Sequence, residues 1–166
     1  MQRADWGGAV LNALCPEAGA SIAIFGTGAV GLCAVMAAAI VGCLPIIAVD
    51  RRPDRLALAA ELGADETIHA QDSDPVEAVR RMCPGGAQYS LDATGDPAAF
   101  RQAVDFLRET GLCGLVGAAP YGAEARLDMT TILRGRSVRG VTEGDVDPDR
   151  LIPPAARALC GWPLAV

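Results

Sequence analysis

The chain has 166 residues, of which 51% are hydrophobic and 20% charged, and its net charge is −6. The composition excludes an intrinsically disordered chain, and the length fits one domain with a buried core. The acidic balance argues against nucleic-acid binding driven by phosphate neutralisation, although backbone amides can still bind a phosphate group locally.

Apolar runs alternate with helical stretches along the chain, which is the pattern of a parallel α/β sheet. Six strands are predicted, at residues 21–25, 46–49, 66–68, 89–91, 111–116 and 137–141. Helices are predicted at 8–14, 29–41, 53–62, 75–82 and 97–107, with a helical turn at 130–133 and a last helix starting near Pro153 or Pro154. This order predicts a doubly wound Rossmann fold with a six-stranded parallel sheet, formed by residues 1–166 as one domain. Asp74 and Asp96 are predicted N-caps.

No charged residue occurs from position 19 to position 49, a length that could cross a membrane. The stretch is interrupted at five positions: Gly26, Gly28, Gly31, Gly42 and Pro45. Buried parallel strands are continuously apolar because helices cover both faces of their sheet. We therefore predict strand, turn, helix, turn and strand here, and no membrane span.

The glycine motif Gly26-Thr27-Gly28-Ala29-Val30-Gly31 follows the first predicted strand and opens the next helix. In this context a G-x-G-x-x-G motif is typical of dinucleotide binding. The first glycine permits a tight turn, the second lets the backbone approach a pyrophosphate, and the third lets the helix pack closely on the sheet. The positive end of the helix would then hold the diphosphate.

An acidic residue, Asp50, ends the second predicted strand about 20 residues after the motif, as the dinucleotide fingerprint requires. Its carboxylate can accept hydrogen bonds from both hydroxyls of an adenosine ribose and would repel a 2′-phosphate. We therefore expect NAD to be favoured over NADP. Arg51 and Arg52 weaken this expectation, because a neighbouring arginine can accommodate the phosphate.

Two further loops follow predicted strands at the same edge of the sheet, Asp92-Ala93-Thr94-Gly95 and Val116-Gly117-Ala118. Ligands of doubly wound sheets bind outside the carboxyl ends of the strands, so both loops are expected near the cofactor. Ordinary strand-to-helix turns that need glycine explain the same residues equally well. His69, the only histidine, has no Cys or His at ligand spacing and is expected on the surface.

The six cysteines form no C-x-x-C pair, and most of them lie in apolar runs. A zinc ribbon or a disulfide framework needs tighter spacing. We therefore predict reduced thiols and a cytoplasmic protein, with no signal peptide at the N-terminus.

A longer series of segments resembles the coenzyme domain of the medium-chain, zinc-type alcohol dehydrogenases, especially the aryl- and benzyl-alcohol branch. The segments are GAVLNAL, SIAIFGTGAVGLCAVMAA, IIAVDRRPDRLALAAELGAD, DPVEAV, GGAQYSLDATG and GVTEGD. The resemblance implies an NAD-binding Rossmann domain. It places the pyrophosphate at Gly26, Gly28 and Gly31, and the adenosine ribose at Asp50 and Arg55.

The same resemblance implies positions for the nicotinamide half of the cofactor. Thr94 and Ala118 would flank it, and the backbone from Val141 to Glu143 would hold its carboxamide. The strand from Ser137 to Val141 resembles an edge that joins two subunits, so a homodimer is expected, and an unpaired edge strand favours such pairing.

In the resembling family, zinc ligands come from a separate N-terminal domain and from a cysteine whose aligned position here is at or next to Met1. The family's four-cysteine structural site also has no counterpart in the sequence. We therefore predict no catalytic residue and no metal ligand, and expect zinc only in the full-length family. The isolated chain is expected to bind NAD but not to oxidise alcohols, whereas the intact enzyme would act on a primary alcohol, with an aromatic one suggested by resemblance alone.

Two other hypotheses remain open from the sequence. The first is a stand-alone or degenerate nucleotide-binding module without catalysis. The chain also shares its pattern with the zinc-free quinone and enoyl reductases, which usually prefer NADP. Asp50 counts against this last branch, whose members often lack an acid there.

Overall fold

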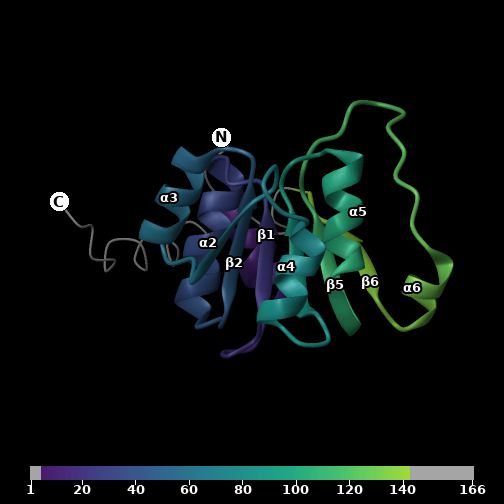
Figure 1. Ribbon diagram of the computed structural model, residues 1–166, viewed down its shortest axis with the longest axis horizontal. Helices are drawn as coiled ribbons and strands as arrows, with labels where there is room; N and C mark the ends of the chain where they lie inside the picture. The colour runs from purple at the N-terminus through teal and green to yellow at the C-terminus, as the bar shows by residue number, and fades with distance from the viewer. Residues whose placement is uncertain (1–4, 143–166) are drawn as a thin grey trace.

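The computed structural model describes residues 5–142 of the chain (Figure 1). The strands are β1 (Ile22–Phe25), β2 (Ile46–Asp50), β3 (Glu66–His69), β4 (Ala87–Asp92), β5 (Leu107–Leu115) and β6 (Ser137–Gly140). The helices are α1 (Asp5–Gly8), its π-helical continuation η1 (Ala9–Leu14), α2 (Ala29–Val41), α3 (Pro53–Glu61), α4 (Pro75–Met82), α5 (Pro97–Asp105) and α6 (Met129–Leu133).

The six strands form one sheet in the order β3-β2-β1-β4-β5-β6, and every neighbouring pair is parallel. The chain runs outward from β1 to β3, returns to the other side of β1, and continues outward to β6. This is the predicted doubly wound Rossmann fold, and the prediction is confirmed. Such a reversal of strand order creates a crevice at the carboxyl ends of the central strands, here β1 and its neighbours.

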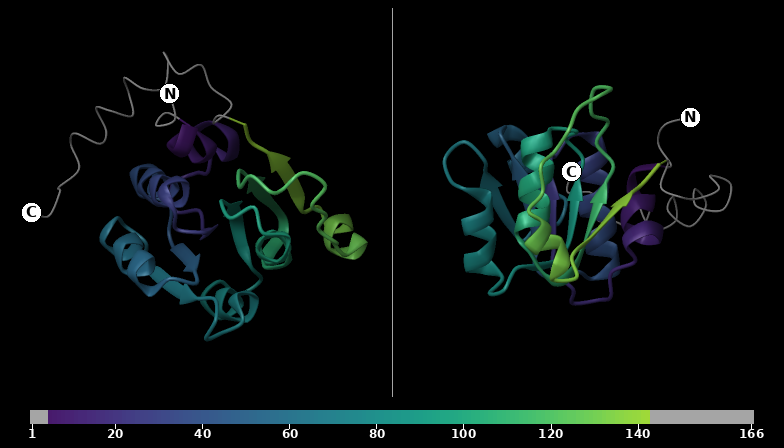
Figure 2. Two further views of the ribbon diagram at one scale, coloured as in Figure 1. Left: turned by 90° about the horizontal axis from the view of Figure 1, so that it is seen from above. Right: turned by 90° about the vertical axis from the view of Figure 1, so that its right-hand side faces the viewer.

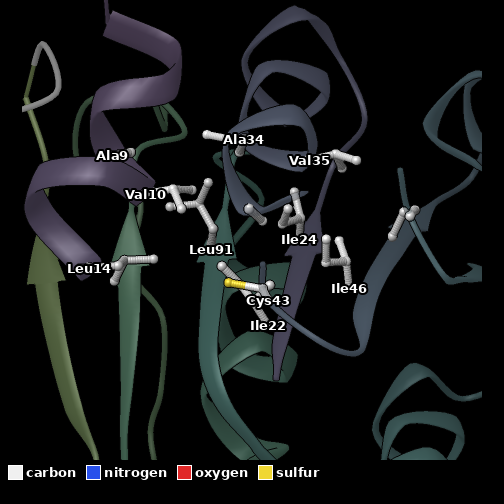
Figure 3. Packing of buried hydrophobic residues seen from close by; sticks show 14 of the residues in the cluster. Ala9, Val10, Leu14, Ile22, Ile24, Ala34, Val35, Cys43, Ile46 and Leu91 are labelled. Atoms are coloured by element: carbon white, nitrogen blue, oxygen red, sulfur yellow. The ribbon is translucent and has the colours of Figure 1, made fainter. Parts of the chain in front are cut away.

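Helices cover both faces of the sheet: α1, α2 and α3 lie on one face and α4 and α5 on the other (Figure 2). Side chains of β1 alternate between the two layers, since Ile22 and Ile24 pack with α2 while Ala23 and Phe25 pack with α4 and α5. Figure 3 shows the first of these cores, where Ile24 and Val35 meet between β1 and α2. Burial on both faces explains why the central strands are uninterrupted apolar runs.

Most predicted boundaries lie within two residues of those in the structure, and the larger differences are at the start of the first helix and at the start of β5, predicted at Gly111 and found at Leu107. Helix α5 ends at Asp105 rather than at Leu107, because the chain is already extended at Leu107, which pairs with Ala87 of β4. Phe106, at the junction, is buried and stacks on Phe25 with ring centroids 5.3 Å apart. The first helix starts at Asp5 and is π-helical from Ala9, with its end marked by the left-handed conformation of Cys15.

The remaining predictions on local structure are readily placed. Asp74 and Asp96 cap α4 and α5 as predicted: the Asp74 side chain accepts the amide of Val76, and the Asp96 side chain accepts the amides of Ala98 and Ala99. The helix predicted near Pro153 lies outside the described residues. Between residues 5 and 142, no helix is both long and apolar enough to cross a membrane.

Candidate functional site

The loops that leave β1, β2, β4 and β5 meet at one edge of the sheet, and they carry most of the predicted site residues. In the sheet, β1 lies between β2 and β4, and β5 follows β4. Register pairs Phe25, the last residue of β1, with Val49 and with Asp92. The glycine motif, Asp50 and the loop after Asp92 therefore start side by side.

The glycine motif turns the chain from β1 into α2, and at two of its glycines the backbone conformation or the close packing excludes a side chain. Gly26 has a φ of +85°, which side-chain-bearing residues rarely adopt. A Cβ on Gly31 would lie 1.8 Å from the carbonyl oxygen of Gly26, so α2 can approach the turn only without a side chain there. The predicted roles of these two glycines, a tight turn and close helix packing, are confirmed.

Gly28 differs from its two neighbours because it faces open space. A Cβ built on it would meet a single atom within 4 Å, Nη1 of Arg55 at 3.8 Å. Gly28 is also the N-cap of α2, and no side chain caps this helix. The first turn of α2 contains no acidic residue, whereas Asp side chains cap α4, α5 and α6. The first amides of α2 and its positive dipole end are thus left for an anion.

Asp50 lies beside this turn and is held by it. Its Oδ2 accepts hydrogen bonds from the amide of Thr27 at 2.6 Å and from the Thr27 hydroxyl at 2.8 Å, and its Oδ1 accepts the Arg52 amide at 3.0 Å. Burial alone would raise the pKa of Asp50, but these hydrogen bonds outweigh it and lower the pKa. Asp50 is therefore a half-buried, ionised carboxylate, and Oδ1 has capacity to accept a further donor.

Three arginines follow Asp50, and the structure gives each a different environment. Arg51 forms an ion pair with Asp96 at 2.8 Å, and Arg52 forms a two-point contact with Asp54. Arg55 is half-buried beside Gly28, and no carboxylate of the described residues lies within ion-pair distance of it. Arg55 is thus the arginine best placed to meet a ligand anion at the glycine turn.

The loop after β4 is built around Asp92, which is fully buried. Its Oδ1 accepts hydrogen bonds from the amide and the hydroxyl of Thr94, and its Oδ2 accepts the Gly95 amide at 3.3 Å. Burial raises the pKa of Asp92 despite these hydrogen bonds. The Thr94 side chain is exposed, and its methyl group lies against Gly26, which joins this loop to the glycine turn.

The loops after β4 and β5 approach each other backbone to backbone. A Cβ on Gly95 would lie 2.5 Å from the carbonyl oxygen of Ala118, and a Cβ on Gly117 would lie 2.1 Å from the Gly95 amide nitrogen. These glycines therefore have a packing reason of their own. The contact leaves Ala118 exposed at the crevice, next to the loop that carries Thr94.

The other predicted positions are less informative about a ligand. Val141 is buried and its amide donates to the carbonyl of Leu115, and Glu143 lies outside the described residues. His69 is less exposed than predicted: its Nε2 is 2.8 Å from the carbonyl oxygen of Arg51, and its Nδ1 is 2.7 Å from Asp72. Within residues 5–142, no group of three or more His, Cys, Asp or Glu side chains could hold a metal ion.

Sequence reasoning missed how the acidic residues of the site are used. It assigned Thr27 to the cofactor, whereas the amide and the fully buried side chain of Thr27 both serve Asp50. It treated Asp96 only as a cap, although the same carboxylate also binds Arg51. These contacts join residues 23 and 45 positions apart, so local patterns carry no signal for them.

Comparisons with known proteins agree with this geometry. The model of the zinc-binding dehydrogenase family matches residues 29–158. Geraniol dehydrogenase of Castellaniella defragrans is 38% identical over 149 residues, which are 88% of this chain and 40% of that protein. The crystal structure of benzyl alcohol dehydrogenase from Acinetobacter calcoaceticus is 38% identical, with a TM-score of 0.92 over 95% of this chain and 44% of that one.

A third relative was solved with a nucleotide. It is a zinc-binding dehydrogenase of unproven activity from Sinorhizobium meliloti 1021, bound to NADP, with 26% identity and a TM-score of 0.83 over 96% of this chain and 46% of that chain. The chain thus spans less than half the length of each of these relatives. The comparisons do not favour a module outside the dehydrogenases. The chain belongs to the zinc-binding dehydrogenase family and corresponds to its nucleotide-binding Rossmann domain.

Proposed function

We propose that this chain binds NAD in the crevice at the carboxyl ends of β1, β2, β4 and β5. We further propose that the intact enzyme transfers hydride between NAD and a primary alcohol. The observation that carries the proposal is the pairing of an uncapped α2 N-terminus with an ionised Asp50 one strand away. The first can hold a diphosphate, and the second can hold a ribose diol.

The described residues offer groups that suit the pyrophosphate, the adenosine ribose and the nicotinamide half of a dinucleotide. The amides at the start of α2 and the Arg55 guanidinium can bind the pyrophosphate above Gly28, where no side chain intervenes. Asp50 can accept the adenosine ribose hydroxyls at Oδ1. Thr94 and Ala118, both exposed, would flank the nicotinamide half. When bound, the nicotinamide supplies the hydride chemistry, and the protein binds and orients it.

The geometry supports NAD rather than NADP. A 2′-phosphate would meet the Asp50 carboxylate, whose lowered pKa keeps it charged. Arginine usually accommodates such a phosphate, but Arg51 and Arg52 are both engaged by carboxylates of the chain. We therefore expect tighter binding of NADH than of NADPH, measured by titration of both under the same conditions.

Replacement of Gly28 with alanine tests the proposed pyrophosphate site. Gly28 has φ −70° and ψ −171°, which alanine adopts readily, and the added Cβ has room in the protein itself. Stability should therefore hold, while the methyl group intrudes where the pyrophosphate approaches and weakens NADH binding by at least about tenfold. Isothermal titration calorimetry with NADH and urea unfolding measure the two effects.

Gly7→Ala is the matched control, because a Cβ there also meets only ordinary contacts, the nearest being Ala37 at 3.7 Å, and lies on α1, away from the turn. NADH affinity should stay unchanged and stability should not fall. If Gly28→Ala binds NADH as tightly as the original chain, the pyrophosphate does not lie over this turn. If the original chain fails to bind NADH at all, the proposed function is wrong.

The alcohol substrate is proposed from relatives alone. Two of the three relatives compared above are described as dehydrogenases of geraniol and of benzyl alcohol, both primary alcohols. The intact enzyme should therefore reduce NAD in the presence of benzyl alcohol or geraniol. Absence of turnover with either alcohol would argue against this substrate class without touching the cofactor proposal.

We also propose that the chain pairs with a second copy through β6. All four residues of β6 are exposed, and within residues 5–142 no strand pairs with its outer edge. Large apolar side chains are exposed on β6 and on α6, the helix that precedes it in the chain: Val138 of β6 is 39% exposed, and Met129 and Leu133 of α6 are each 85% exposed. Sedimentation should give a dimer for the chain and a monomer for Val138→Asp; a monomeric original chain would overturn the proposal.

We also propose that the protein is located in the cytoplasm. The five cysteines in the described residues are free, and free thiols persist in a reducing compartment.

A further inference from the structure

We propose that Asp96 is a positioning residue for cofactor choice: it holds Arg51 away from the ribose next to Asp50 and so favours NAD over NADP. The inference rests on the proposed nucleotide site. Asp96 lies on the opposite side of β1 from Asp50, so the proposed discrimination between NAD and NADP involves residues from both sides of this strand.

The ion pair joins loops on opposite sides of the central strand. Arg51 directly follows Asp50 at the end of β2, and Asp96 follows β4, with β1 between these two strands. Nη2 of Arg51 lies 2.8 Å from Oδ2 of Asp96. The guanidinium of Arg51 is therefore drawn across the edge of the sheet toward α5, although its backbone stands beside the ribose-binding carboxylate.

Asp96 is fixed in this role by contacts that are independent of Arg51. Its Oδ1 caps α5 by accepting the amides of Ala98 at 2.8 Å and Ala99 at 3.3 Å, and its own amide donates to the Thr94 hydroxyl at 3.0 Å. The hydrogen bonds from the Ala98 and Ala99 amides lower the pKa of Asp96, and Arg51 lowers it further. Oδ2 is left to face Arg51 as a fixed negative charge.

Arg51 is the arginine that Asp96 can release to a 2′-phosphate. Arg52, the N-cap of α3, is bound through two hydrogen bonds by Asp54 in the first turn of that helix, and Arg55 faces Gly28, where the pyrophosphate is proposed. Arg51 has a single ion-pair contact, and its side chain is 63% exposed. Removal of the Asp96 charge would therefore free a guanidinium next to the ribose without disturbing the other two.

Asp96→Asn tests the inference, because asparagine caps helices about as well as aspartate and removes only the charge. We expect NADPH to bind about threefold more tightly, the size of effect typical of an exposed ion pair. NADH affinity should change by less than about twofold. Asp74→Asn, which removes the same charge from the equivalent cap of α4, should change neither affinity.

A double-mutant cycle with Arg51→Gln separates release of Arg51 from a general change in charge. The gain in NADPH affinity should vanish in Arg51→Gln/Asp96→Asn relative to Arg51→Gln. Should wild-type NADPH binding be too weak to measure, the same comparison in an Asp50→Ser background gives the ratio. A gain that persists without Arg51, or no gain at all, overturns the inference; failure to bind NADH overturns the proposed function instead.

Discussion

Two aspartates end neighbouring strands of the sheet, yet their environments differ. Asp50 closes β2 and Asp92 closes β4, on either side of β1. Asp50 is half-buried and the pKa of its carboxyl is lowered, whereas Asp92 is fully buried and its pKa is raised. Both carboxylates accept a hydrogen bond from a threonine hydroxyl: Asp50 from Thr27, 23 positions earlier, and Asp92 from Thr94, two positions later.

The two carboxylates differ in which parts of the chain donate hydrogen bonds to them. The hydrogen bonds that the Asp92 carboxylate accepts come from its own loop, from Thr94 and Gly95. The Asp50 carboxylate accepts hydrogen bonds from the glycine turn that follows a neighbouring strand, and its Oδ1, which accepts the Arg52 amide, retains acceptor capacity. Asp92 therefore stabilises a loop, whereas Asp50 keeps a charge available at the ligand edge. An acid at a strand end indicates a ribose site only when burial leaves it charged and reachable.

The largest expected effect is on stability, from Asp92→Ala. The amides of Thr94 and Gly95 would lose their acceptor in a region where the Gly95 backbone packs against Ala118. Because an unsatisfied buried donor costs about 1–3 kcal/mol, we expect unfolding free energy to fall by about 2–4 kcal/mol. Urea unfolding measures this. A loss below about 1 kcal/mol would mean that water replaces the carboxylate and that Asp92 does not hold the loop.

A smaller effect, on cofactor choice, is expected from Asp50→Ser. The serine removes the charge that a 2′-phosphate would meet and shortens the side chain that accepts the ribose hydroxyls. NADH affinity should fall about tenfold and the NADH-to-NADPH affinity ratio should move toward NADPH, since a hydrogen bond to a charged group contributes about 1.5–3 kcal/mol. Asp92→Asn is the control, because it neutralises the other strand-end acid and should leave the ratio unchanged. An unchanged NADH-to-NADPH affinity ratio in Asp50→Ser would show that Asp50 does not bind the adenosine ribose.

How far the sequence predicts this molecule depends on the range of the contacts involved. The alternation of apolar runs and glycines predicted the parallel sheet, and the start of α2 at Ala29 follows from a motif of six consecutive residues. The junction at Phe106 was placed wrongly because a helix pattern continues through it, while stacking on Phe25 and pairing of Leu107 with Ala87 decide the conformation. Likewise, Asp50 could be assigned from its spacing, but the ion pair of Arg51 with Asp96 depends on strand order, which only the folded chain reveals.

The smallest expected effect is a pair of opposite pH dependences of stability. Asp50 has a lowered pKa in the fold, so its stabilisation is complete above the ordinary aspartate value of 3.8 and is lost as pH falls through the lowered value. Asp92 has a raised pKa, so the folded chain holds its proton more tightly and loses stability as pH rises from 3.8 through the raised value. Unfolding free energies of the original chain minus those of Asp50→Asn should therefore rise with pH below about 4, and the same difference for Asp92→Asn should fall with pH above about 4. Each slope is limited to about 1.4 kcal/mol per pH unit. Slopes of the same sign would contradict the contrast between the two acids, because they would place both carboxylates in equivalent surroundings.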